Sequence, residues 1–122
     1  MILHLQDIAV VSKKNRLQFG KGRAYKPKSV TSFEEELRRA ATECAPPQPL
    51  LGPLRMSITV TVPNRIRRDL QNFSDTICDA LNGVWYADDC QIEELHMRKV
   101  YASDRRWSLT VAVEEYENAH LP

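Results

Sequence analysis

Apolar and polar residues alternate in two early segments of the 122-residue chain, which predicts strands over residues 2–10 and 54–63. Between these segments, apolar residues recur at helical spacing and predict a helix over residues 32–44. Ser32 and Glu35 form a capping-box pattern at its start. The chain therefore begins with a strand, a helix and a second strand.

The next segments predict a second helix and two more strands. The helix has an apolar stripe made of Leu70, Phe73, Ile77, Ala80, Leu81 and Val84. Asn82-Gly83 supplies its C-terminal stop. Alternating runs at about residues 92–101 and 106–115 are predicted to form a β-hairpin. The order β-α-β-α-β-β predicts an α+β fold in which both helices pack on one mixed sheet.

Acidic residues gather on the second helix and shortly after it. Asp69 begins the helix, Asp75 and Asp79 lie away from its apolar stripe, and Asp88-Asp89 precedes the next strand. If the helix packs back on the sheet, Asp69 and the Asp-Asp pair are expected to share one site. Carboxylates so placed need a cation, and hard oxygen ligands select magnesium or manganese. The alternative is a solvated acidic face, with Asp69 favourable in the first helical turn.

The net charge of the chain is only +1, but its basic residues are unevenly distributed. Residues 11–30 contain no acidic residue, and the basic residues among them are Lys13, Lys14, Arg16, Lys21, Arg23, Lys26 and Lys28. Glycines and a proline predict that this segment is a loop. Together with Arg65, Arg67 and Arg68, it indicates a surface for nucleic-acid phosphates, and an acidic metal site beside arginines suits phosphodiester cleavage. A merely solubilising loop is the alternative.

Length and composition exclude several other classes of protein. The length and the 27% of charged residues are typical of one folded domain. No apolar run reaches the roughly 18 residues of a membrane span, and no signal peptide is recognisable, so a cytoplasmic protein is expected. Cys44, Cys78 and Cys90 are odd in number and lack C-x-x-C spacing, so free thiols are predicted and neither disulfides nor a zinc site. No organic cofactor is expected.

The stretch "RRDLQNFSDTICDALNGVWYADDCQI" resembles the signature of the RusA family of Holliday-junction resolvases. In that signature a D-L-D-N-L start, a D-A-L-N-G helix end and a D-D-x-Q-[IV] turn follow one another at this spacing. Upstream, Ser12, Asn15, Arg16 and Tyr25 resemble the family's S-x-N-x-x-Y loop, and downstream Lys99 lies in the strand after the D-D turn. The resemblance covers nearly the whole chain and implies a single RusA-like nuclease domain over residues 1–122.

The resemblance implies a small, homodimeric, metal-dependent endodeoxyribonuclease that cuts four-way DNA junctions by paired symmetric nicks in recombination and repair. Two essential aspartates of the family carry over to Asp69 and Asp89, and Asp75 is a third candidate catalytic residue. The implied ligands of Mg²⁺ or Mn²⁺ are Asp69, Gln71, Asp88 and Asp89. The expected DNA contacts are Lys13, Lys14, Asn15, Arg16, Lys21, Arg23, Arg67, Arg68 and Lys99. Such a protein would associate with the nucleoid when bound to DNA.

Two positions depart from the family pattern. Gln71 replaces the second aspartate of D-L-D-N, so a neutral amide stands where the family has a carboxylate. Asp75 replaces a lysine that the family carries one turn later in the helix. Either Asp75 restores the lost negative charge and the enzyme is active, or the site has decayed and the protein binds branched DNA without cutting it efficiently.

Overall fold

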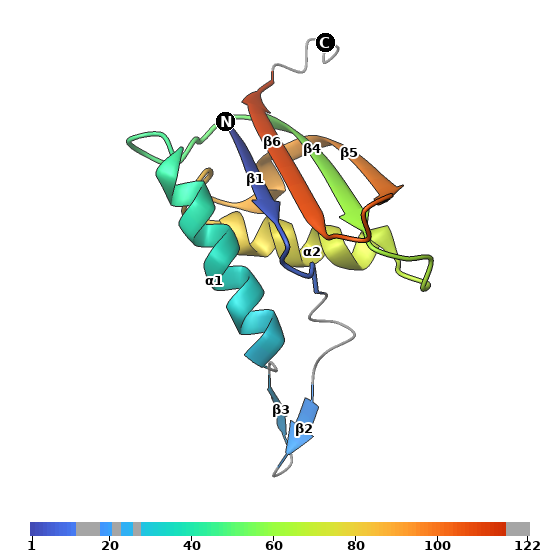
Figure 1. Ribbon diagram of the computed structural model, residues 1–122. Coiled ribbons are helices and arrows are strands. Elements are labelled where there is room, and N and C mark those ends of the chain that lie inside the picture. Colours follow the sequence, from blue (N-terminus) through green and yellow to red (C-terminus); the bar gives the residue numbers. More distant parts are fainter. Residues whose placement is uncertain (12–17, 21–22, 26–27, 117–122) are drawn as a thin grey trace.

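A four-stranded sheet with two helices on one face forms the body of the protein in a computed structural model (Figure 1). The structure describes residues 1–11, 18–20, 23–25 and 28–116. The elements are β1 (Ile2–Gln6), β2 (Gln18–Gly20), β3 (Arg23–Tyr25), α1 (Lys28–Glu43), β4 (Leu54–Val62), α2 (Leu70–Leu81), the 3-10 helix η1 (Asp89–Gln91), β5 (Ile92–Tyr101) and β6 (Ser108–Glu115).

The strands of the sheet follow the order β1-β6-β4-β5. β5 runs parallel to β4, whereas β6 runs antiparallel to both β4 and β1. The predicted α+β fold with one mixed sheet is therefore confirmed. The short strands β2 and β3 form a separate antiparallel ribbon that stands away from the sheet (Figure 1).

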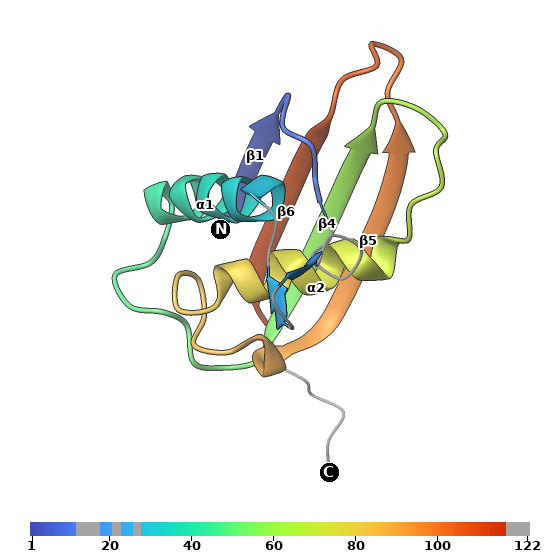
Figure 2. The ribbon, with the colours of Figure 1, turned by 90° about the horizontal axis from the view of Figure 1, so that it is seen from below.

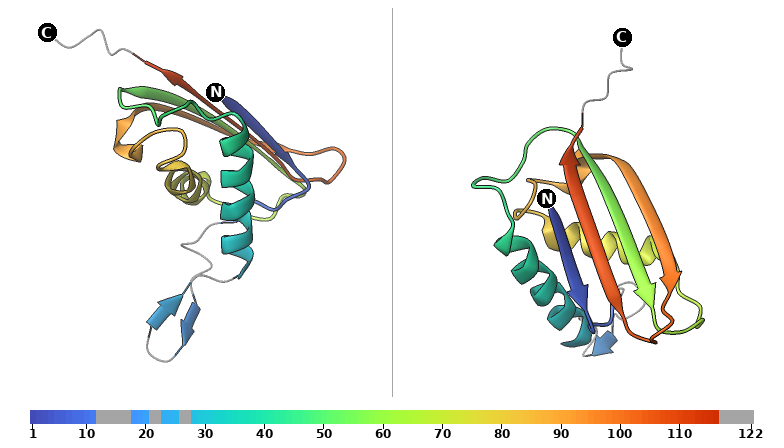
Figure 3. Two further views of the ribbon diagram at one scale, coloured as in Figure 1. Left: turned by 90° about the vertical axis from the view of Figure 1, so that its left-hand side faces the viewer. Right: turned by 45° about the horizontal axis from the view of Figure 1, so that its top comes forward.

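Both helices cover the same face of the sheet, as its edge-on view shows (Figure 3). Alternate side chains of β4 point toward the helices, and the buried ones are Leu54, Met56, Ile58, Val60 and Val62. The helices bury Val30, Phe33, Leu37, Ala41, Phe73, Ile77, Ala80 and Leu81 against this face. Each large apolar side chain removed from water in this way stabilises the fold by about 1.5–3 kcal/mol. Within the described part of the chain, neither helix is long and apolar enough to cross a membrane.

The predicted hairpin between the last two strands is wrong. β5 and β6 lie on opposite sides of β4 and share no ladder with each other. β4 carries the most completely buried side chains of the sheet. A neighbouring strand on each side shields β4 from solvent at both of its edges. Alternation predicted both strands, but it contains no information on which strand becomes the partner.

Other predictions also differ from the structure. α1 begins at Lys28, one turn before the predicted capping box at Ser32, because the extra turn buries Val30 in the core. β1 ends at Gln6, since Asp7 has a φ of 60° and leaves the extended conformation. The basic segment, predicted to be a loop, contains β2 and β3.

Two aromatic side chains fix the chain where it returns from α2. Trp85 and Tyr86 are fully buried. The Trp85 indole Nε1 donates to the Ala41 carbonyl of α1 at 2.9 Å, and the Tyr86 hydroxyl donates to the Cys78 carbonyl of α2 at 2.7 Å. These bonds tie the segment after α2 to both helices. They therefore determine where the following Asp-Asp pair lies.

We expect Trp85→Phe to lower the free energy of unfolding by about 2 kcal/mol, because it leaves a cavity and removes one hydrogen bond to a buried carbonyl. The matched control is Trp107→Phe, at a half-buried indole with no such hydrogen bond among the described contacts. We expect that control to cost less than about 1 kcal/mol. Urea unfolding followed by circular dichroism measures both, and equal losses would contradict the anchoring role of Trp85.

Candidate active site on α2 and η1

α2 buries one side and leaves a polar side available for chemistry. Phe73, Ile77 and Leu81 pack into the core, while Asp75 and Asp79 are half-buried at the border of the polar side. Asp69 is the N-cap residue in an extended conformation, but its side chain makes no capping hydrogen bond. The carboxylate of Asp69 therefore does not cap the backbone N–H groups at the start of the helix.

The Asp-Asp turn is held by a network of short-range hydrogen bonds. Asp88 Oδ1 accepts from the Cys90 backbone N–H at 3.1 Å, and Gln91 Oε1 accepts from the Asp88 N–H at 2.8 Å. The amide group of Gln91 also donates to the carbonyls of Leu50 at 2.8 Å and Gly52 at 3.0 Å. Gln91 thus clamps η1 to a neighbouring loop, which gives a physical reason for a D-D-x-Q pattern.

Three carboxylates interact where η1 meets α2. The Asp88 pKa is lowered because the Cys90 N–H donates to its carboxylate. The pKa of Asp89 is raised, first by burial and then by the neighbouring carboxylates of Asp88 and Asp79. Burial, followed by the charges of Asp89, Asp79 and Asp75, also raises the pKa of Cys78 to about 12. Negative charge therefore accumulates on this flank of α2 in the absence of a cation.

The sequence-predicted acidic residues fall into two places. The described interactions bring Asp89 together with Asp88 and Asp79, whereas Asp69 has Arg67 as its ion-pair partner, with 3.9 Å between Nε and Oδ1. Asp69 and Asp79 are separated by roughly 15 Å along α2, at 1.5 Å per residue. Gln71 is exposed in the first turn, on the Asp69 end of the helix. Across residues 1–11, 18–20, 23–25 and 28–116, no three His, Cys, Asp or Glu side chains are grouped closely enough to hold a metal ion.

Asp69 borders a cavity of about 320 Å³ that also contacts Arg67, Arg68, Asn72 and Trp107. The guanidinium of Arg68 lies 4.9 Å from the centre of the Trp107 ring and donates to Asn64 Oδ1 at 2.9 Å. Arg67 is 93% exposed. One arginine is thus held in place and the other faces solvent beside the Asp69 carboxylate.

A second basic pocket, of about 600 Å³, lies between the end of β5 and the segment that precedes α2. Arg65 stacks on Tyr101 with its guanidinium 4.1 Å from the ring centre, and Arg105 borders the same pocket. Lys99 donates to the Arg68 carbonyl at 3.1 Å and so ties this segment to β5. Sequence reasoning missed the Arg65–Tyr101 pair, because two residues so far apart in the chain give no local signal.

Only part of the basic segment belongs to the residues that the structure describes. Arg23 lies in β3, on the ribbon that stands on the helix-bearing side of the sheet (Figure 3). Lys13, Lys14, Asn15, Arg16 and Lys21 lie outside the described residues. Of the predicted DNA contacts, Arg67, Arg68 and Lys99 are therefore the ones whose side chains the structure describes.

Comparison with protein families supplies the decisive observation. The family described as endodeoxyribonuclease RusA matches residues 7–114, which include both helices, β4, β5 and all but the last residue of β6. The chain belongs to the RusA family. Membership in the RusA family supports endonuclease activity on branched DNA of the Holliday-junction type. Comparison with individual curated proteins gives no match.

Asp79→Asn should raise the melting temperature at neutral pH in metal-free buffer, because the Asp79 charge helps to raise the pKa of Asp89. A carboxylate whose pKa is raised on folding destabilises the folded protein when it is ionised, and this effect disappears below the unfolded-state pKa of about 3.9. Removing the Asp79 charge should therefore stabilise the protein at pH 7 and have no effect near pH 3. Calorimetry at both pH values, with Asp104→Asn as a surface control, measures the difference. A gain at both values would contradict the carboxylate crowding.

Proposed function

We propose that this RusA-family protein is a divalent-metal-dependent endodeoxyribonuclease that resolves four-way DNA junctions as a homodimer, by paired symmetric nicks, in recombination and repair. The observation that carries the proposal is the crowding of Asp79, Asp88 and Asp89 between α2 and η1, in a chain with the family's motif order. Such an enzyme would act in the cytoplasm, at the nucleoid when bound to DNA.

The donor set at this site fits Mg²⁺ or Mn²⁺. Its groups are hard oxygen donors, and Asp89 is already disfavoured as an isolated anion by burial and by its neighbours. Mg²⁺ usually takes only one or two protein carboxylates and completes its shell with water and substrate phosphates. We assign Asp88 and Asp89 as ligands, with Asp79 adding charge beside them. Asp69 and Gln71 are further candidate ligands from the family motif, at the other end of α2.

A bound divalent ion would supply a reactive hydroxide at neutral pH and would neutralise charge on the phosphate. Asp89 would fix the position of that positive charge, while Asp75 restores part of the negative charge that Gln71 lacks. Arg67 and Arg68 would bind backbone phosphates on the approach to the site. Lys99 would position the arginine segment through the Arg68 carbonyl.

A second candidate function is binding of branched DNA without efficient cleavage. Gln71 and Asp75 favour it, because they remove a carboxylate and a cation from positions where the family carries them. Both functions need the same basic surface, so binding experiments do not separate them. Cleavage in the presence of Mg²⁺ or Mn²⁺ does.

Asp89→Asn should lower the rate of junction cleavage by at least about 100-fold, because it removes a metal ligand. Binding to a synthetic four-way junction should be unchanged or tighter, since a negative charge near the phosphates is lost. Gel-based cleavage and binding assays measure both, with Asp104→Asn as the exposed control. If Asp89→Asn cleaved the junction at the wild-type rate, the assignment of Asp89 as a metal ligand would be contradicted.

The pair of substitutions Gln71→Asp and Asp75→Lys separates the two candidate functions. If the wild-type protein is an active variant that depends on Asp75, it cuts the junction and Asp75→Lys alone lowers cleavage by about tenfold or more. If the site has decayed, the wild type only binds, and Gln71→Asp combined with Asp75→Lys restores cleavage. Absence of cleavage in all variants, with junction binding retained, would contradict the nuclease proposal.

A further inference from the structure

β5 is an open edge of the sheet. The strand order leaves its outer side without a neighbouring strand among the described residues, over the whole length Ile92–Tyr101. Two of its apolar side chains are conspicuously exposed, Leu95 at 44% and Tyr101 at 41%. A long edge strand carries a row of free N–H and C=O groups, which can recruit another strand. The outer side of β5 is therefore a candidate surface for pairing with another strand.

The sequence of β5 is complementary to itself when it is read in both directions from His96. An antiparallel copy centred on this residue places Leu95 opposite Met97 and Glu94 opposite Arg98. The outer pairs continue the pattern, with Glu93 opposite Lys99 and Ile92 opposite Val100. Apolar residues meet apolar residues and each glutamate meets a cation, and these are the favourable cross-strand pairs.

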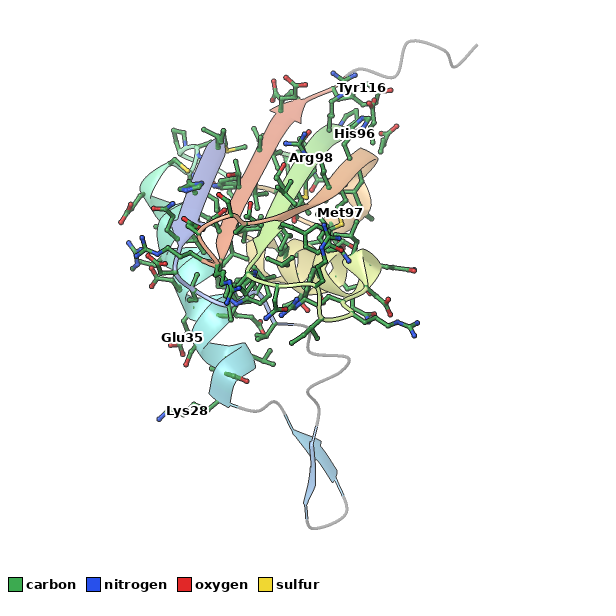
Figure 4. The ribbon with its side chains drawn as sticks, turned by 45° about the vertical axis from the view of Figure 1, so that its right-hand side comes forward. Lys28, Glu35, His96, Met97, Arg98 and Tyr116 are labelled. Carbon is green, nitrogen blue, oxygen red and sulfur yellow. The ribbon has the colours of Figure 1, made fainter. Side chains whose placement is uncertain are left out.

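We propose that β5 pairs with β5 of a second copy of this chain, antiparallel and centred on His96, which joins the two sheets into one. Figure 4 labels His96, Met97 and Arg98, which belong to β5, the outer strand of the sheet. The interface builds on the homodimer of the proposed function. The partner strand is identified as a second β5 because, in each of the pairs named above, both residues belong to β5.

Charge in this strand is already arranged for such pairing. Glu94 interacts with His96 and with Arg55, whose guanidinium lies 3.2 Å from Glu94 Oε2. These contacts lower the pKa of Glu94, with His96 as the larger cause, so the carboxylate is ionised at neutral pH. Arg98 is exposed and makes no ion pair among the described contacts. Arg98 is therefore available to the Glu94 of a second copy.

The symmetry of this pairing suits paired nicks. The local two-fold axis of an antiparallel strand pair is perpendicular to the sheet, so both copies present the same face. Both helices cover one face, and α2 crosses it with its N-terminal end close to β5 (Figure 2). Lys99 Nζ donates to the Arg68 carbonyl, which places the arginine segment beside β5. The two arginine segments would then flank the axis on one side of the dimer.

Two opposite charge variants test the interface without DNA. Arg98→Glu places two carboxylates opposite each other in each self-pair, and Glu94→Lys places two cations together, so each variant alone should have a dimer dissociation constant about tenfold or more above wild type. Mixed in equal amounts, they regain both attractive pairs and should form a heterodimer. Sedimentation and native mass spectrometry measure this. If each variant, measured by itself, had the same dimer dissociation constant as the wild type, the proposal would be overturned.

A cysteine at the axis gives an independent test. In a Cys44→Ser, Cys90→Ser background, His96→Cys would face its own copy at a Cα separation of about 4.5–5.5 Å, which a disulfide can span. Oxidised glutathione should crosslink this variant, whereas the control Arg98→Cys faces Glu94 and should remain uncrosslinked. Equal crosslinking of both, or a monomer at all concentrations, would overturn the interface. Cleavage by such a monomer would leave the nuclease proposal standing, and a β5-linked dimer without cleavage would remove only the nuclease proposal.

Discussion

The packing of α2 against β4 is the constraint on which the candidate site depends. Ile77 is fully buried, and Cys78 Sγ lies 3.7 Å from Met56 Sδ of β4. Tyr86 then folds the following segment back by donating to the Cys78 carbonyl. Because the chain must return along α2, the Asp-Asp pair of η1 meets the carboxylate of Asp79. The acidic cluster is thus a consequence of apolar burial on the other side of the same helix.

The clustered carboxylates favour the proposed function but lower the stability of the fold. Burial and neighbouring charges raise the pKa of Asp89, so the ionised cluster works against folding unless a cation is present. The surrounding structure offsets this effect through bonds that do not involve the carboxylates, chiefly those of Trp85, Tyr86 and Gln91. The acidic cluster is therefore supported by a framework that does not depend on a cation, which is the arrangement expected if the proposed metal site is preorganised.

Local patterns predicted the elements of this fold better than their relations. The alternation of 54–63 and the apolar stripe of α2 predicted both elements, since each pattern reports on one buried face. The hairpin prediction failed because β5 pairs with β4, a buried strand that is distant in sequence. The expected meeting of Asp69 with Asp89 is not among the described contacts, because α2 lies across the sheet and carries Asp79 toward η1 instead. The Arg65–Tyr101 contact likewise depends on tertiary structure alone.

The small net charge of the chain makes the placement of its basic residues decisive for DNA binding. At a net charge of +1, long-range attraction to DNA is weak, and affinity must come from local contacts with phosphates. One copy offers Arg65, Arg67 and Arg68 on a single segment beside the end of β5. A second copy related by an axis perpendicular to the sheet adds the same segment on the same face, so the number of phosphate contacts doubles. Because the salt dependence of affinity scales with that number, dimerisation through β5 would steepen the salt dependence of junction binding about twofold, and a two-fold symmetric DNA junction would match both segments at once.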